Sequence, residues 1–91
     1  MRIDILCKPE SESRGERVLR NVRAALAELE VNAEVHLYLD RRKMIDSRVY
    51  VAPALLVDDV VRVAGRVPEV REIRSFLVER PRYVQRLSKV A

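Results

Sequence analysis

Two apolar runs in the second half of the chain are separated by only two residues. Residues 54–57 and 60–64 are rich in valine and leucine, and Asp58 and Asp59 alone connect them. A two-residue connection of this kind is typical of an antiparallel hairpin, and aspartate tolerates the positive φ angles of its tight turn better than most residues. The sequence therefore predicts a β-hairpin over residues 54–64, ended by Gly65.

In the first half of the chain, the spacing between apolar residues changes twice along the sequence. Residues 2–7 form an apolar, β-branched run that is typical of a buried strand. Residues 14–30 repeat apolar side chains at helical spacing, and Ser13 stands three residues before Glu16, as in a capping box. Residues 33–39 alternate apolar and polar side chains, as in a strand with one buried face. This order favours a parallel, right-handed crossover.

Two further helices are expected. Asp40 is placed to cap a short helix over residues 41–47. Pro68 suits the first turn of a longer helix, whose apolar stripe reaches Glu79 and which Pro81 ends.

The order β-α-β-(α)-β-β-α predicts one α/β domain with a four-stranded mixed sheet flanked by helices. The chain has 91 residues, 48% of them apolar, which is enough for one modest core. We expect residues 1–80 to form this domain. Residues 81–91 are expected to be a tail, which either docks as a short helix or frays.

Composition excludes several classes of protein. One cysteine, Cys7, and one histidine, His36, give neither an intramolecular disulfide nor the four ligands of a zinc site, so no metal or cofactor is expected. No apolar run reaches the roughly 18 residues of a membrane span, and Asp4 interrupts the segment where a signal peptide would be apolar. A cytoplasmic protein without a membrane partner is expected.

The charge pattern argues against nucleic-acid binding. The net charge of +4 comes from fifteen arginines and three lysines, with fourteen acidic residues among them. Pairs such as Glu16 with Arg20, and Glu69 with Arg74, stand near helical spacing. This pattern favours an ion-paired surface over a face that gathers cations for phosphates.

Four segments of the chain together carry a family pattern: Ile3-Asp4-Ile5-Leu6, residues 21–26, residues 51–58 (Val-Ala-Pro-Ala-Leu-Leu-Val-Asp) and residues 65–73. In these segments, over about residues 1–79, the chain resembles the small thioredoxin-like proteins known as redox-active disulfide proteins, which are similar in size to glutaredoxins. The resemblance implies a thioredoxin-like fold with a cis peptide bond before Pro53, beside a groove. The N–H and C=O groups of Ala52 would then be free to pair with an extended peptide.

The chain departs from that family at its reactive motif. The family carries Cys-x-x-Cys at the start of the first helix, where one thiol attacks and the other resolves the mixed disulfide. Depending on how the loop is aligned, Glu10 and Ser13, or Glu12 and Gly15, stand there in this chain. We therefore do not expect an ordinary dithiol oxidoreductase, and the sequence leaves open whether any enzymatic activity remains.

The expected function is a redox-inactive binding module for another protein or an extended peptide. Its peptide-binding residues are expected to be Ala52, Pro53 and Ala54 in the groove, with Gly65 and Arg66 at its end. Arg66 supports two interpretations, because it either reaches a peptide carboxylate there or is an ordinary surface arginine.

Cys7 supports two interpretations, and the sequence leaves both open. It is either a small buried side chain that closes the first strand or the single catalytic thiol of a monothiol oxidoreductase or thiol sensor. In the second case Lys8, Arg14 or the helix N-terminus would activate it.

The second strand is expected to present polar side chains outward. Glu34, His36 and Tyr38 would then lie at the surface, with His36 acting as a surface residue rather than a base. These residues protect an exposed strand edge only partly, so homodimerisation through residues 33–39 stays open.

Overall fold

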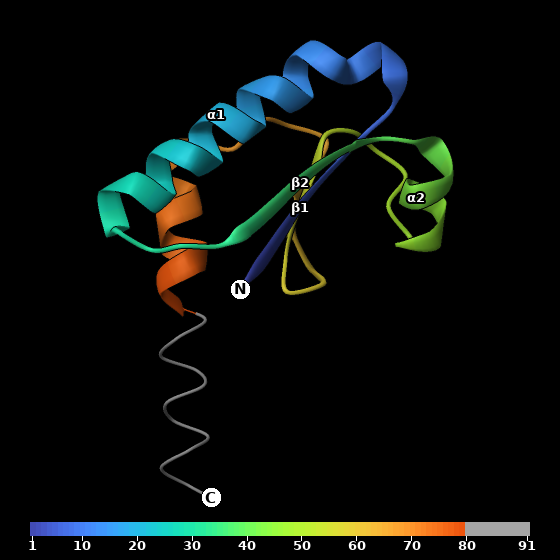
Figure 1. The fold of residues 1–91 in the computed structure, drawn as a ribbon. Helices are drawn as coiled ribbons and strands as arrows, with labels where there is room; N and C mark the ends of the chain where they lie inside the picture. The colour runs from blue at the N-terminus through green and yellow to red at the C-terminus, as the bar shows by residue number, and fades with distance from the viewer. Residues whose placement is uncertain (80–91) are drawn as a thin grey trace, which may run out of the picture.

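A computed structural model describes residues 1–79 (Figure 1). Its elements are β1 (Arg2–Cys7), a 3₁₀ turn (Pro9–Ser11), α1 (Glu12–Leu29), β2 (Glu34–Leu39), α2 (Arg41–Asp46), β3 (Ala54–Val57), β4 (Val60–Ala64) and a helical segment over residues 70–79. We call the last of these the C-terminal helical segment. The predicted tail, residues 81–91, lies outside the described residues.

The four strands form one mixed sheet in the order β2-β1-β3-β4. β1 runs parallel to β2, from the pair Arg2 and Glu34 to the pair Cys7 and Leu39. β1 is antiparallel to β3, and β3 is antiparallel to β4. The predicted parallel pairing of the first two strands and the predicted hairpin are both confirmed, and β2 and β4 lie at the two edges.

The hairpin turn is held by an interaction with the start of β1. Asp58 and Asp59 have φ angles of 48° and 67°, in the left-handed region. The main-chain N–H of Arg2 donates to Asp58 Oδ1 at 2.9 Å. The two-residue turn is therefore tied to the central strand as well as closed by its own geometry.

A β-bulge between Leu55 and Leu56 leaves Arg62 of β4 without an opposite residue on β3. The guanidinium group of Arg62 lies over the ring of Phe76, 5.7 Å from its centroid, and Arg62 Nη1 donates to Glu79 Oε2 at 3.2 Å. The bulge thus turns a strand residue toward the C-terminal helical segment.

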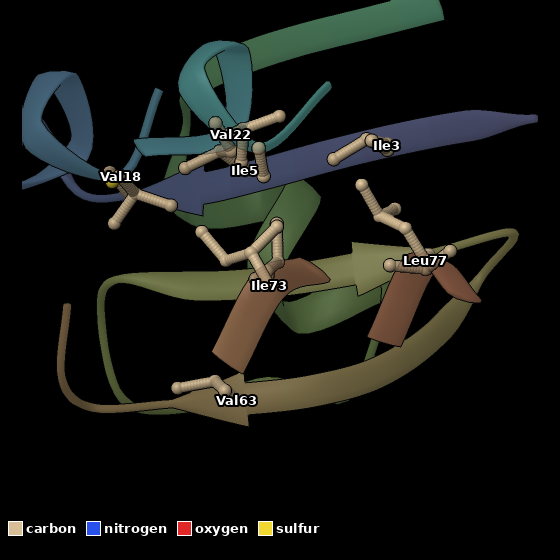
Figure 2. Close-up of a cluster of buried hydrophobic side chains, with 11 residues drawn as sticks. Ile3, Ile5, Val18, Val22, Val63, Ile73 and Leu77 are labelled. Atoms are coloured by element: carbon tan, nitrogen blue, oxygen red, sulfur yellow. The ribbon is translucent and has the colours of Figure 1, made fainter. Parts of the chain in front are cut away.

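The main core lies between the sheet, α1 and the C-terminal helical segment. Figure 2 shows Val18 and Val22 of α1 gathered with Ile5 of β1 and with Ile73 of the C-terminal helical segment. These side chains are fully buried. Both longer helices therefore cover the same face of the sheet.

A smaller core lies on the opposite face, where α2 packs. Met44 of α2 contacts a cluster that includes Leu6, Val49, Ala54 and Leu56. Helices on both faces of a mixed sheet confirm the predicted architecture. Every helix within residues 1–79 is too short or too polar to cross a lipid bilayer.

Three local predictions are wrong. α1 begins at Glu12 with Ser11 as its N-cap, so Ser13 lies inside the helix and forms no capping box with Glu16. The reason is that the 3₁₀ turn over residues 9–11 leads directly into α1.

Among the described residues, neither the predicted pair of Glu16 with Arg20 nor that of Glu69 with Arg74 forms. Arg74 Nη1 instead donates to Glu28 Oε1 of α1 at 2.8 Å. Glu69 Oε2 lies 3.9 Å from Arg71 Nη2. Because α1 packs beside the C-terminal helical segment, a carboxylate from another helix is closer to Arg74 than one on its own helix.

The turn geometry predicts opposite roles for its two aspartates. Asp59→Gly should raise the free energy of unfolding by about 0.5–1 kcal/mol, because glycine adopts a positive φ without the cost of a Cβ. Asp58→Gly should give no such gain, since it also removes the acceptor of the Arg2 N–H. Urea unfolding of both variants measures the difference, and equal effects would contradict this account.

Candidate functional site

The segment before β3 carries the feature expected from the family resemblance. The Ala52–Pro53 peptide bond is cis. Pro53 and Ala54 are buried, Ala52 is half-buried, and the N–H of Gly65 donates to the carbonyl of Pro53 at 2.9 Å. The structure therefore brings four of the five predicted residues together, at the junction of β3 with the end of the hairpin.

The peptide group of Ala52 differs from its neighbours because its N–H and C=O have no hydrogen-bond partner within residues 1–79. Tyr50 and Val51, just before it, are 68% and 55% exposed. Val51 also lies against Gly65, since a Cβ built on Gly65 would be 3.5 Å from Val51 Cγ2. We call residues 50–53 with Gly65 the cis-proline loop surface.

Sequence reasoning missed Tyr50 and Val51. They lie between a weak helix and a strand, where no periodicity assigns an apolar residue to a buried or an exposed position. Their place directly before Ala52-Pro53 was the available signal.

Arg66, the fifth predicted residue, is an exposed arginine that is paired within the chain. Its Nη1 and Nη2 donate to the two carboxylate oxygens of Glu72, at 2.9 and 2.6 Å. The main-chain N–H of Glu69 donates to the same carboxylate at 3.0 Å. The hydrogen bonds from Arg66, followed by that from Glu69, lower the pKa of Glu72 to about 2. The guanidinium group predicted to bind a peptide carboxylate is thus paired within the chain.

Arg14 lies closer to the cis-proline loop surface. This exposed residue in the first turn of α1 donates from Nη2 to the carbonyl of Gly65 at 3.2 Å. Within residues 1–79 it forms no ion pair. A cation from α1 therefore reaches the end of the hairpin, 51 residues further along the chain.

Cys7 is packed as a buried side chain at the end of β1. It is fully buried, and a Cβ built on Gly15 of α1 would lie only 2.5 Å from its Sγ. Burial raises the pKa of the Cys7 thiol, and the positive charge of Arg14 opposes that rise. The absence of a side chain at Gly15 is what lets α1 rest on the sulfur.

At the position of the family's cysteine motif this chain carries carboxylates, which form an ion pair and lie at a helix N-terminus. Glu10, in the 3₁₀ turn, forms an ion pair with Arg41 of α2. Glu12 begins α1, where a carboxylate is favourable near the helix N-terminus. This corner of the molecule therefore carries carboxylates and one buried thiol.

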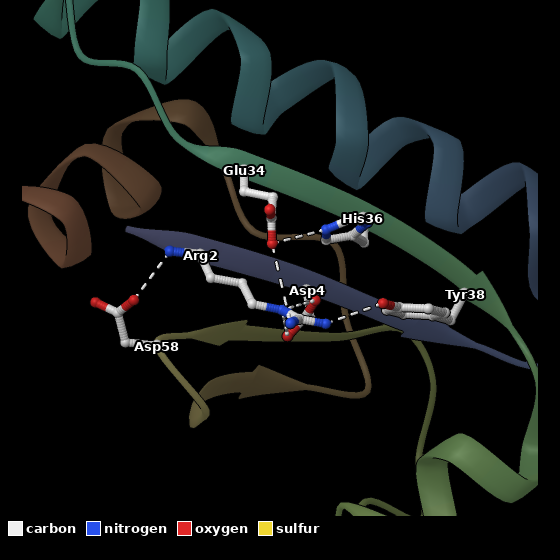
Figure 3. Close-up of polar contacts among 6 residues, drawn as sticks. All are labelled: Arg2, Asp4, Glu34, His36, Tyr38 and Asp58. Carbon is white, nitrogen blue, oxygen red and sulfur yellow. Dashed lines mark hydrogen bonds and ion pairs between the residues drawn. The ribbon is translucent and has the colours of Figure 1, made fainter.

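A polar cluster runs along β1 and β2, on the face of the sheet that α2 covers (Figure 3). Arg2 Nε donates to both carboxylate oxygens of Asp4, at 3.1 and 3.2 Å, and Arg2 Nη2 donates to the hydroxyl of Tyr38 at 3.0 Å. His36 Nε2 lies 3.0 Å from Glu34 Oε2, and the ring of His36 stacks on the ring of Tyr38. Within residues 1–79, no buried side-chain nitrogen or oxygen of this cluster lacks a hydrogen-bond partner. Within the described residues, no group of three His, Cys, Asp or Glu could hold a metal ion.

The burial of Cys7 predicts an inert thiol in the native protein. Alkylation by iodoacetamide should be slow at pH 7 and should become fast when the protein is unfolded. Because the folded pKa is raised, this group's contribution to stability is complete below about pH 8.5 and is lost as the pH rises through the folded value. Cys7→Ala should therefore lose less stability than the unmodified protein above pH 8.5. A fast native reaction at pH 7 would contradict this assignment.

The pairing of Arg66 predicts an acidic titration of Glu72. Its carboxyl signal, followed by NMR, should titrate at a pH of about 2. The stability this group contributes is present above its unfolded pKa of about 4.3 and is lost as the pH falls through about 2. Arg66→Gln should move the midpoint toward 4.3. Arg71→Gln should move it less, because Arg71 makes the smaller contribution. A midpoint unchanged in Arg66→Gln would show that Arg66 is free in solution.

Comparison with known proteins agrees with this geometry. Residues 1–78 match the family model described as Thioredoxin domain. A search of curated proteins found no match. The matched region includes the whole mixed sheet, α1, α2 and the cis-proline before β3, and its one cysteine excludes a Cys-x-x-Cys pair. This chain therefore belongs to the thioredoxin domain family.

Proposed function

We propose that this chain is a redox-inactive thioredoxin-domain protein that binds an extended segment of another protein at the cis-proline loop surface. The observation that carries the proposal is the peptide group of Ala52, which has no hydrogen-bond partner within residues 1–79. An extended peptide binds such a group as an added strand, with main-chain hydrogen bonds that do not depend on its sequence.

The surroundings of Ala52 support this proposal. Tyr50 and Val51 offer exposed apolar area beside the free peptide group, and aromatic side chains are enriched at protein interfaces. The loop is also held in place, because Pro53 and Ala54 are buried and the carbonyl of Pro53 accepts the Gly65 N–H. A surface fixed before binding loses little conformational entropy when a partner arrives.

The thiol chemistry supports the absence of redox activity. Disulfide exchange by a dithiol enzyme needs a second cysteine, and the chain has only Cys7. That thiol is buried and its pKa is raised, so little thiolate forms at neutral pH. These observations favour the binding module over a monothiol oxidoreductase or a thiol sensor.

Binding is tested by NMR on the ¹⁵N-labelled full chain, titrated with a short capped peptide of alternating valine and threonine. The amides of Val51 and Ala52 should shift and saturate. Val51→Ser should weaken binding about fivefold, since roughly 1 kcal/mol of apolar burial is lost.

Val60→Ser is the matched control, because Val60 is 54% exposed but lies beside the hairpin turn, at the other end of β4 from Gly65. It should leave the affinity unchanged. If the Ala52 amide does not respond to the peptide, or if both serine variants weaken binding equally, the proposal is wrong.

A further inference from the structure

We infer that Arg14 selects the partner, so that the segment bound at the cis-proline loop surface is acidic as well as extended. This inference rests on the proposed function and adds to it the charge of the bound segment and the residue that recognises it. The geometry points to Arg14 rather than to Arg66, which is paired with Glu72.

A chain of short contacts joins Arg14 to the loop. Arg14 Nη2 donates to the carbonyl of Gly65 at 3.2 Å, and the N–H of Gly65 donates to the carbonyl of Pro53 at 2.9 Å. Val51 lies against the same glycine. The guanidinium group of Arg14 and the free peptide group of Ala52 therefore belong to one surface.

The guanidinium group of Arg14 is also available to a partner. Gly65 accepts one of its five N–H donors, and within residues 1–79 no carboxylate pairs with it. Nearby arginines differ in this respect, because Arg41 is paired with Glu10 and Arg66 with Glu72. Arg14 is held in position by a neutral carbonyl, which leaves its charge uncompensated.

A carboxylate is the group that fits this arrangement. The planar guanidinium group binds a carboxylate through two parallel hydrogen bonds. Successive side chains of an extended segment point to opposite sides, so a segment that alternates apolar and acidic residues can place one kind against Val51 and the other toward Arg14.

The experiment compares three peptides that differ only in charge. Two threonines of the valine and threonine peptide are replaced by glutamate, glutamine or lysine, and each affinity for the full chain is measured by the shift of the Ala52 amide. The glutamate peptide should bind about twofold to fivefold more tightly than the glutamine peptide, as expected for one exposed ion pair, and the lysine peptide should bind more weakly than both.

Arg14→Gln should remove the preference for glutamate without abolishing binding of the glutamine peptide. Arg20→Gln is the control, because Arg20 is also an exposed α1 arginine without an ion pair among the described residues, but it lies six residues further along the helix. It should keep the preference. The amide spectrum of each variant shows that it is folded before binding is measured.

The outcomes separate the two proposals. If all three peptides shift Ala52 with equal affinity, or if Arg14→Gln keeps the preference, the role of Arg14 is wrong while peptide binding stands. If no peptide shifts Ala52, the proposed function itself fails. If the Ala52 amide shifts with protein concentration in the absence of peptide, the occupant is a second copy, and the inference of an acidic partner is overturned.

Discussion

The burial of β1 on both of its faces is the constraint around which this structure is built. Ile3 and Ile5 point into the core formed with α1 and the C-terminal helical segment, while Leu6 points into the core beneath α2. β1 also lies between β2 and β3 in the sheet. Each fully buried aliphatic side chain contributes about 1.5–3 kcal/mol, so this strand links both cores and both halves of the sheet. β3 is also buried on both faces, but among the described strands β1 is the one that pairs with both β2 and β3 and so joins the parallel to the antiparallel part of the sheet.

The cis-proline loop depends on β1 through its neighbours. β3 pairs with β1 and starts directly after Pro53, and β4 pairs with β3 and ends directly before Gly65. The pairing of β3 with β4 therefore brings the loop next to the end of the hairpin, and the hydrogen bond from the Gly65 N–H to the Pro53 carbonyl holds them together. The packing of α1 on β1 then brings Arg14 to the same corner. The cis-proline loop surface is therefore built without any contribution from the Cys7 thiol.

The same packing explains why the Cys7 thiol is buried. Gly15 allows α1 to approach the sulfur of Cys7 so closely that no space for a reagent is left between them. Burial raises the thiol pKa more than the charge of Arg14 lowers it. The close contact between helix and strand that stabilises this end of the domain thus also withholds the cysteine from solvent.

Most of the fold was predictable from short-range patterns. The two-residue turn at Asp58 and Asp59, the alternation in β2 and the helical spacing in α1 are local signals, since each follows from the period at which side chains meet one buried surface. The motif before β3 located the cis-proline, and the cysteine count excluded a dithiol site. The start of α1 was misplaced because a 3₁₀ turn and an α-helix share similar local preferences.

Such local patterns could not predict which partners the charged residues would have or which apolar residues would stay exposed. Arg14 and Gly65 lie 51 residues apart, and Arg74 binds a carboxylate 46 residues away on another helix. Cys7 is buried because α1 carries a glycine above it, and Val51 stays exposed because no described element covers the loop. Sequence periodicity assigns a residue to an element and to a face. Which residues from distant elements meet, and which remain open to a partner, depends on how those elements pack together in three dimensions.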